Sequence, residues 1–194
     1  MNHLIVYAHP FEDSFNHAIL ESAVAALESK GHSVVVRNLY ALGFNPVLSP
    51  VDFKELRSGN TPEDIATEQA FIKNADAITL IYPLWWTGLP AILKGYIDRV
   101  FAYGFAYQYS KKGMVEGLLA SKKGFMITTH GTPNMYYDAS GMTQSLKQTT
   151  DEGIFSFCGV ATLNHLFFGG ISTSDDLTRK EMLKTVQLTL KELF

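Results

Sequence analysis

Short, continuous apolar runs recur along the chain, and they constrain its fold more than any other feature. Residues 4–8 and 77–82 are the clearest of these runs, and each is too short for an independent helix. Because polar and apolar residues do not alternate in them, both faces of each segment must be covered, as in the central strands of a parallel sheet. Three further candidate strands are residues 34–36, 124–129 and 160–168. The chain therefore predicts five strands.

Segments with helical signals separate these strands. Ser14 is a natural helix cap, apolar side chains then recur at helical spacing, and Gly31 ends this helix. Thr61-Pro62 and Pro90 mark two more helix starts, with the proline in the first helical position. Two further helices are expected, at about 143–157 and from 175 onward.

The alternation of strands and helices predicts a doubly wound α/β fold with a five-stranded parallel sheet. The expected strand order is the flavodoxin-like order 2-1-3-4-5. With 194 residues the chain suits one domain, which we expect to span residues 1–194. The connection at 40–60 is long, so we expect a functional or intersubunit excursion that holds only a short helical turn at 51–56.

The composition is that of an ordinary globular protein, with 46% hydrophobic and 18% charged residues. A net charge of −3 gives no reason to expect a nucleic acid or an anionic membrane as partner. No apolar run approaches a bilayer span and no signal peptide precedes the first strand, so we expect a cytoplasmic protein without membrane insertion. The single cysteine, Cys158, excludes an internal disulfide, and its aromatic neighbours indicate an inert buried thiol. We expect no metal site.

In this strand order the loops after the first and third strands meet at the carboxyl edge of the sheet, where open α/β folds bind ligands, with the loop after the fourth strand beside them. These loops are residues 9–16, 83–88 and 128–136. The first loop ends at a helix N-terminus that carries Ser14 and Asn16, which favours an anion. It contains neither G-x-G-x-x-G nor a P-loop motif. In an alternative interpretation Ser14 only caps the helix and His9 only bonds the backbone.

Two adjacent indoles, Trp85 and Trp86, lie in the second loop. Large aromatic side chains are costly to leave in water unless something flat packs against them. The alternative is that they merely cover the edge of the sheet. Together the three loops offer an anion site, aromatic surface and hydroxyl groups, a combination that favours a phosphorylated, flat heterocycle.

Four motifs carry a resemblance to a known family. They are Ala8-His9-Pro10 with Ser14-Phe15-Asn16, then PLWWTGLPAILKG at 83–95, FAYQY at 105–109, and TTHG at 128–131 with Tyr136. The chain resembles the flavodoxin-like NAD(P)H:quinone oxidoreductases, the group of the DT-diaphorases, the bacterial modulators of drug activity and the potassium-efflux regulatory oxidoreductases. The resemblance implies flavin-dependent, two-electron hydride transfer from NAD(P)H through flavin N5 to quinones or similar electron-poor aromatics, with ping-pong kinetics.

The resemblance also implies roles for individual residues. The flavin phosphate and ribityl chain would be held by His9, Ser14, Phe15 and Asn16. The isoalloxazine edge would be lined by Pro83, Leu84, Trp85, Trp86 and Thr87, the pyrimidine end by Thr128, Thr129, His130 and Gly131, and N1–O2 would lie near Tyr136. Tyr107 and Tyr109 would wall the substrate pocket of the other subunit, which implies a homodimer with shared active sites.

The chain departs from the family pattern at two places. Met142 stands where the diaphorases have a histidine that assists the charge at N1–O2, and His130, in place of a glycine, is the candidate to compensate. Tyr136 and His130 are therefore the candidate catalytic residues. The stretch between Asn60 and Asp64 is shorter than in members that contact adenine there, which weakens the case for FAD over FMN. We still lean to FAD, with FMN as the alternative and NAD(P)H as co-substrate.

Two other functions fit the same fold. One is a flavodoxin-type electron carrier, but such carriers are usually strongly acidic and this chain has a net charge of only −3. The other is a regulatory flavoprotein subunit that docks on a membrane transporter, although no basic or hydrophobic docking run stands out in the sequence. We therefore expect an enzyme.

Overall fold

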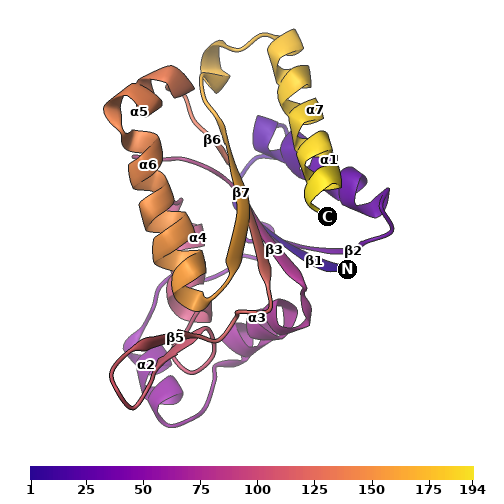
Figure 1. The fold of residues 1–194 in the computed structure, drawn as a ribbon. Coiled ribbons are helices and arrows are strands. Elements are labelled where there is room, and N and C mark those ends of the chain that lie inside the picture. The colour runs from indigo at the N-terminus through magenta and orange to yellow at the C-terminus, as the bar shows by residue number, and fades with distance from the viewer.

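The computed structural model describes residues 1–194 as one parallel sheet of five strands between two layers of helices (Figure 1). The strands are β1 (Asn2–Tyr7), β2 (Ser33–Asn38), β3 (Ala77–Pro83), β6 (Lys123–Thr129) and β7 (Ala161–Phe168). Their order in the sheet is β2-β1-β3-β6-β7, and all four pairings are parallel. The predicted fold class and the flavodoxin-like strand order are thereby confirmed.

Helices cover both faces of the sheet. The α-helices are α1 (Phe15–Glu28), α2 (Pro50–Arg57), α3 (Glu63–Asn74), α4 (Ala91–Val100), α5 (Asn134–Ser140), α6 (Met142–Lys147) and α7 (Asp176–Leu193). Helix α6 continues into a π-helix, η1 (Gln148–Phe155), and a 3₁₀ turn, η2 (Ser156–Cys158); a second 3₁₀ turn is η3 (Ile171–Thr173). Helices α1 and α7 pack on one face, and α3, α4, α6 and η1 contribute to the core on the other. None of the helices has the length and hydropathy that crossing a membrane requires.

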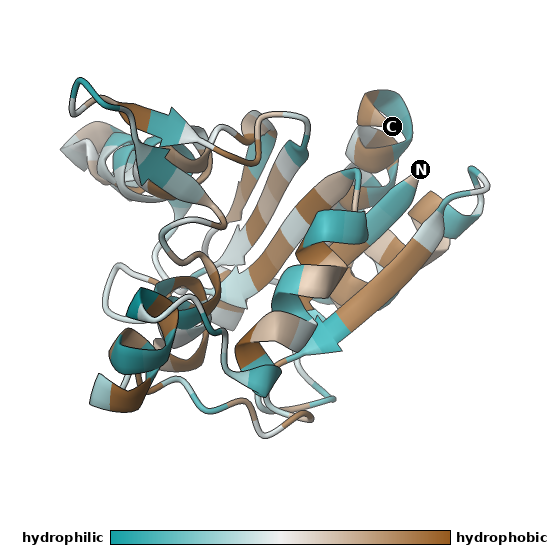
Figure 2. Cartoon of the chain, turned by 90° about the horizontal axis from the view of Figure 1, so that it is seen from below, coloured by the Kyte–Doolittle hydropathy of each residue, from teal (hydrophilic) through white to brown (hydrophobic).

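The apolar runs of the sequence form the interior strands. All seven residues of β3 are buried, and the strands of the sheet are largely hydrophobic (Figure 2). This is the expected result for parallel strands with helices on both faces. Cys158 is buried as predicted, and burial raises the pKa of its thiol to about 11, which makes it unreactive.

The structure corrects the predicted helix starts. Pro62 and Pro90 are the N-cap residues of α3 and α4 rather than their first helical residues, and neither cap involves a side-chain hydrogen bond. Both prolines have extended ψ angles, 142° and 144°, which a cap position requires and which proline readily adopts. The expected short turn at 51–56 is the full helix α2, whose start is fixed by a capping box between Ser49 and Asp52.

Two further predictions need correction: the segment 103–109 is not wholly irregular, and the helix predicted at 143–157 is not a single regular α-helix. Residues 103–109 contain strand β4 (Tyr107–Tyr109), which forms an antiparallel hairpin with β5 (Val115–Gly117). The helix expected at 143–157 starts earlier and changes type, because Gly141 in a left-handed conformation (φ 78°) separates α5 from α6 and η1 widens the following turns. Apolar spacing alone does not distinguish a π-helix from an α-helix.

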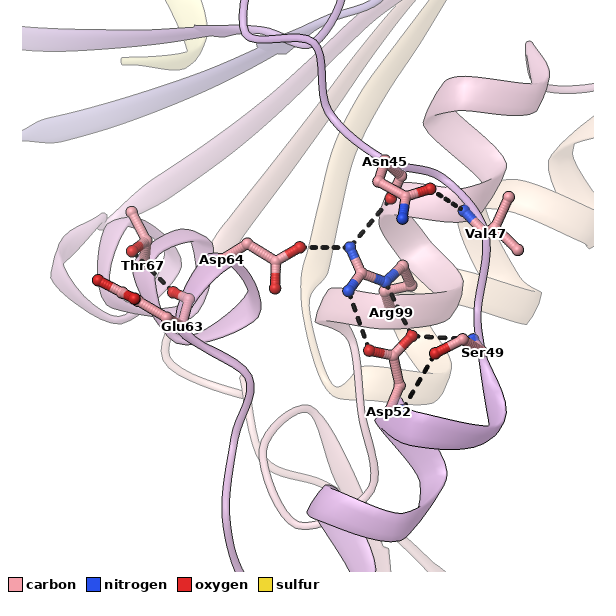
Figure 3. A network of polar contacts seen from close by, with 8 residues as sticks. All are labelled: Asn45, Val47, Ser49, Asp52, Glu63, Asp64, Thr67 and Arg99. Atoms are coloured by element: carbon pink, nitrogen blue, oxygen red, sulfur yellow. Dashed lines mark hydrogen bonds and ion pairs between the residues drawn. The ribbon is translucent and has the colours of Figure 1, made fainter.

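A buried arginine fixes the long connection between β2 and α3 onto α4 (Figure 3). Two side-chain nitrogens of Arg99 donate to the carboxylate of Asp52, at 3.1 and 3.0 Å, and a third interaction joins Arg99 to Asp64. A hydrogen bond of 3.0 Å to the carbonyl of Asn45 completes the network. Gly95 allows this close approach, because a Cβ there would lie 2.1 Å from the carbonyl oxygen of Pro46. The connection is therefore an ordered arm, and it braces the helix that follows the tryptophan loop.

A histidine pair lies at the amino edge of the sheet, away from the loops that carry the candidate residues. The ring nitrogens His3 Nε2 and His32 Nδ1 are 2.8 Å apart, and the two rings stack with centroids 4.9 Å apart. Burial, reinforced by the neighbouring His32, lowers the pKa of His3 to about 4. The folded protein therefore binds a proton at His3 less readily than the unfolded chain does.

We predict that this pair makes the protein acid-sensitive. Because the pKa of His3 falls from its ordinary value of 6.5 to about 4 on folding, the free energy of unfolding should decrease between pH 6.5 and pH 4, by roughly 2 to 3 kcal/mol. Urea denaturation over this range should show the loss, and His3→Asn should show a smaller one. An equal loss in both proteins would contradict the assignment to His3.

Candidate functional site

Three loops meet at the carboxyl edge of the sheet, as the sequence predicts. The imidazole of His9 lies 6.2 Å from the ring of Trp85, which joins the loops after β1 and β3. Asn16 Nδ2 donates to Thr129 Oγ1 at 2.7 Å, and the backbone N–H of Leu84 donates to the Thr129 carbonyl at 2.7 Å. The end of β6 is thus bonded directly to the first turn of α1 and to the loop after β3.

The loop after β1 presents the N-terminus of a 14-residue helix. Ser14 caps α1 by accepting a hydrogen bond from the backbone N–H of His17 at 3.2 Å, and His9 Nδ1 accepts one from the N–H of Phe11 at 3.2 Å. These are the local roles of the alternative interpretation, yet the first turn of a helix retains N–H groups that an anion can bind. Asn16 is 4% exposed, and its side-chain oxygen has no hydrogen-bond partner.

A cation that the sequence analysis missed lies beside this helix start. Arg179 of α7 places its guanidinium 5.9 Å from the ring centroid of Phe15. Its side chain is held by hydrogen bonds to Ser174 Oγ, at 3.0 Å, and to the carbonyl of Ile171, at 3.1 Å. The sequence feature that could have identified Arg179 is its position in the first turn of the last predicted helix, where the helix dipole disfavours a cation.

The loop after β3 forms a strained, tight turn. Trp85 and Gly88 exchange two backbone hydrogen bonds of 3.1 Å around Trp86 and Thr87, which have φ angles of 50° and 54°. Such turns are normally made by Asn-Gly, and non-glycine residues in this region cost on the order of 1 kcal/mol or more each. Trp86 is fully exposed, so the interpretation that both indoles merely cover the sheet edge is wrong for this residue.

The loop after β6 contains a buried histidine that lacks a well-formed hydrogen bond. His130 is 5% exposed, and its ring stacks on Tyr137 with centroids 4.4 Å apart. Neither ring nitrogen makes a hydrogen bond of good geometry, although the backbone of Thr132 and the side chain of Asn134 lie close enough to raise its pKa in opposition to burial. Burial lowers the pKa of the His130 imidazole, so the ring is neutral at pH 7. Buried polar atoms are almost always paired, and those left over need an explanation, such as a ligand.

Other residues expected around this loop are placed differently. Thr128 is fully buried and bonds the Leu166 carbonyl at 3.4 Å, whereas Thr129 points to Asn16. Tyr136 lies on α5 with 61% of its surface exposed, while its neighbour Tyr137, which the sequence analysis did not single out, contacts His130. At Gly131 an added Cβ would meet only Ser172 Oγ, at 3.8 Å, so the space beside His130 is open.

The two candidate pocket tyrosines form a separate aromatic cluster. Tyr107 contacts Tyr109 and Tyr103, with ring centroids 6.1 and 5.8 Å apart, and Phe157 of η2, with centroids 5.0 Å apart. The cluster and the tryptophan turn of the same chain flank α4 in the sequence, and no ring contact joins them. The ten residues of α4 span about 15 Å.

A cavity of about 690 Å³ runs along α4 and connects these two regions. Thr87 and Gly88 line one end, Tyr107 and Phe157 line the other, and nine of the 16 lining residues are hydrophobic. A mostly apolar concave surface of this size is typical of a binding site or of an interface with another chain.

A model of the family described as "Flavodoxin-like fold" matches residues 1–190. The chain belongs to this family. A protein of Haemophilus influenzae named as an uncharacterized NAD(P)H oxidoreductase is 42% identical over 185 residues, which cover 95% of this chain and 91% of the relative. The NAD(P)H dehydrogenase [quinone] 1 of Cavia porcellus is 35% identical over 200 residues, covering 93% of this chain and 72% of the relative.

A solved structure agrees with these relatives. The NAD(P)H:quinone oxidoreductase from Methanothermobacter marburgensis superimposes with a TM-score of 0.91 at 30% identity, and the match covers 100% of this chain and 99% of that one. The family resemblance and the oxidoreductase class expected from the sequence are therefore confirmed.

The strained turn leads to a stability prediction. Thr87→Gly should raise the free energy of unfolding by about 1 kcal/mol, because glycine adopts φ 54° without steric cost. Thr67→Gly in the middle of α3 is the matched control, and it should lower stability because glycine weakens a helix. Urea denaturation of both variants measures the difference. A loss of stability at both positions would show that the turn is not strained.

Proposed function

We propose that the chain is a single-domain, flavin-dependent NAD(P)H oxidoreductase that transfers two electrons to quinones or similar electron-poor aromatics. A bound flavin would supply the atom, N5, that first accepts and then donates hydride. The observation that carries the proposal is the fully exposed Trp86 on a strained turn after β3, together with the buried His130 after the neighbouring strand β6, whose ring nitrogens make no well-formed hydrogen bond. A flat ring with a polar edge satisfies both at once.

The residues present fit a phosphorylated flavin. The carboxyl edge combines a helix N-terminus, an exposed indole and three buried polar atoms without a well-formed hydrogen bond, namely Asn16 Oδ1 and both ring nitrogens of His130. In our proposal the phosphate and ribityl chain contact His9, Ser14, Phe15 and Asn16. The ring contacts Pro83, Leu84, Trp85, Trp86 and Thr87 at one edge, and the backbone of Thr128 with Thr129, His130 and Gly131 at the other.

Arg179 supports the choice of FAD over FMN as the proposed cofactor. Its guanidinium adds a fixed positive charge beside the N-terminus of α1, where the helix dipole already favours an anion. Two adjacent positive regions suit a diphosphate better than a single phosphate. FMN remains the alternative, and the relative affinities for the two flavins test the choice.

Tyr136 and His130 are the proposed donors at N1–O2, where hydride transfer to a flavin leaves negative charge. Neutral His130 donates one N–H without adding a charge of its own, and the exposed hydroxyl of Tyr136 is free to turn toward a ligand. Donors placed where charge develops contribute roughly 2 to 4 kcal/mol. Met142 lies partly buried against the core and supplies neither a charge nor a hydrogen-bond donor.

The site also requires a second copy of the chain in this proposal. Tyr107 and Tyr109 lie about a helix length from their own tryptophan turn, and although Tyr107 shares a cavity with Thr87 and Gly88, we propose that the two tyrosines wall the acceptor pocket of a partner subunit. Val47, Val51 and Phe53 on the arm before and within α2 are exposed by 64%, 62% and 47%, which is unusual for apolar residues of a monomer. We therefore propose a homodimer with shared active sites.

A reconstitution experiment tests the function. The purified protein, saturated with FAD, should reduce a simple quinone with NADPH or NADH, and initial rates at several quinone concentrations should give the parallel lines of ping-pong kinetics. Trp86→Ala should weaken flavin binding. A protein that binds neither FAD nor FMN, or that binds flavin without being reduced by either nicotinamide, would contradict the proposal.

The proposed donor gives a second prediction. Tyr136→Phe should slow flavin reduction about 10²-fold while changing flavin affinity little, because the interaction strengthens only once charge has developed. Tyr137→Phe is the matched control, since it keeps the ring that stacks on His130, and it should reduce at the wild-type rate. Stopped-flow reduction by NADPH measures both. A wild-type rate in Tyr136→Phe together with a slow His130→Ala would assign the role to His130 instead.

A further inference from the structure

A pair formed by a buried imidazole and a half-buried carboxylate lies outside the proposed flavin contacts. Asp151 Oδ1 is 2.8 Å from Nδ1 of His165, whose side chain is 1% exposed. The hydroxyl of Thr150 lies 2.9 Å from Asp151 Oδ1 and 2.8 Å from the carbonyl of Leu146, and its single proton is shared between these two acceptors. Burying a charged group is costly unless it is paired and hydrogen-bonded, so this pair is expected to have a definite role.

A bulge in β7 turns His165 toward its partner. Gly124 pairs with Thr162 and Phe125 pairs with Asn164, so one extra residue, Leu163, interrupts the register. Because side chains alternate along a strand, one inserted residue exchanges the faces of everything that follows. Beyond the bulge, His165 and Phe167 share one face of β7, where their rings stack with centroids 3.9 Å apart, and the hydrogen bond to Asp151 shows that His165 faces η1.

A second backbone irregularity presents Asp151. This residue belongs to the eight-residue π-helix η1, and such widened turns are rare and often mark functional sites. The π-helix approaches the sheet closely at Gly124, where a Cβ would lie 2.4 Å from the ring of Phe155. The bulge at Leu163 in β7 and the widened turns of η1 thus both contribute to the position of the hydrogen bond between Asp151 and His165.

The π-helix leads directly to the aromatic cluster of the proposed acceptor pocket. Phe157 follows its last residue by two positions and contacts Tyr107. Thr150, Gly153 and Phe157 also line the 690 Å³ cavity along α4. Any change in the winding of η1 would therefore move Phe157 and the cavity wall together.

We propose that Asp151 and His165 are positioning residues for the acceptor pocket: their hydrogen bond holds η1 in its widened form and so keeps Phe157 against Tyr107. That this pocket binds the electron acceptor rests on the function proposed above. That the hydrogen bond between Asp151 and His165 stabilises η1 rests only on contacts within this chain.

The charges around His165 make the stability of η1 depend on pH. Burial lowers the pKa of His165; Asp151 opposes this shift and Lys147, in the preceding turn, adds to it. From β3 the pair faces Tyr82, whose buried hydroxyl stays neutral because burial raises its pKa. Protonation would itself strengthen the bond to Asp151, but burial of the charged ring costs more, so opening of η1 becomes easier as the pH falls below 6.5, the ordinary pKa of histidine.

Two substitutions separate the hydrogen bond from the ring. His165→Leu removes the donor, and hydrogen-exchange protection of residues 148–158 at pH 7 should fall about tenfold, as expected for the loss of one hydrogen bond to a buried charge. The KM for quinone should rise by a similar factor, while the rate of flavin reduction by NADPH stays unchanged. His165→Asn keeps an N–H near the position of Nδ1. At pH 7 the His165→Asn variant should have the same hydrogen-exchange protection of residues 148–158 as the wild type. At pH 5 the wild type should lose part of this protection, and the variant should not.

Glu68→Gln is the matched control. The single N–H of Arg37 Nε is shared by both carboxylate oxygens of Glu68, at 3.1 Å each, and Glu68 is 3% exposed. Glu68 lies on α3 and Arg37 on β2, away from η1. This substitution should lower global stability without a specific loss of protection at residues 148–158.

Three results would overturn the inference. The first is that hydrogen-exchange protection of residues 148–158 is unchanged in His165→Leu. The second is that His165→Asn loses this protection as His165→Leu does, because the ring would then matter more than the hydrogen bond. The third is lost protection with an unchanged KM for quinone, which would leave the pair a purely structural role. A wild-type protein without quinone turnover would contradict the proposed function instead, whereas the protection factors need no turnover and would still decide whether the pair holds η1.

Discussion

The hydrogen bond between Asn16 Nδ2 and Thr129 Oγ1 joins the two ends of the candidate site. It connects the first turn of α1, where an anion would bind, to the end of β6, immediately before His130, across the intervening strand β3. Both side chains are buried, so the bond is shielded from water and its loss would leave unpaired polar groups. The relative position of the anion site and the histidine therefore depends on this contact.

Between these two ends, the tryptophan turn is held in a conformation that its sequence disfavours. Two backbone hydrogen bonds between Trp85 and Gly88 close the turn, the N–H of Leu84 is bonded to the Thr129 carbonyl, and the prolines before and after restrict the chain further. On the far side, the Arg99 network braces α4 through the arm at 45–64. Strain of this kind persists only when the surroundings determine it, and it is concentrated at binding sites in proteins.

The sequence was sufficient to predict the sheet, its strand order and the meeting of the three loops. Each interior strand is buried on both faces, so its composition alone identifies it. Positions that depend on contacts distant in the chain were not predictable. Arg179 reaches Phe15 only after α7 has folded onto α1, and the selection of Tyr137 rather than Tyr136 as the residue that stacks on His130 depends on how α5 is oriented. The bulge at Leu163 and the π-helix also leave no periodic signal, since each is a single departure from a regular pattern.

The central claim is that the carboxyl edge binds a flavin against the tryptophan turn, and intrinsic fluorescence tests it directly. Trp85 and Trp86 are the only two tryptophans of the chain, and Trp86 is fully exposed. A titration of the flavin-free protein with FAD should therefore quench most of the tryptophan emission, saturating at one flavin per chain, and Trp86→Phe should retain binding with a smaller quench. Emission that stays unchanged, after correction for flavin absorption, on addition of FAD or FMN would contradict the account.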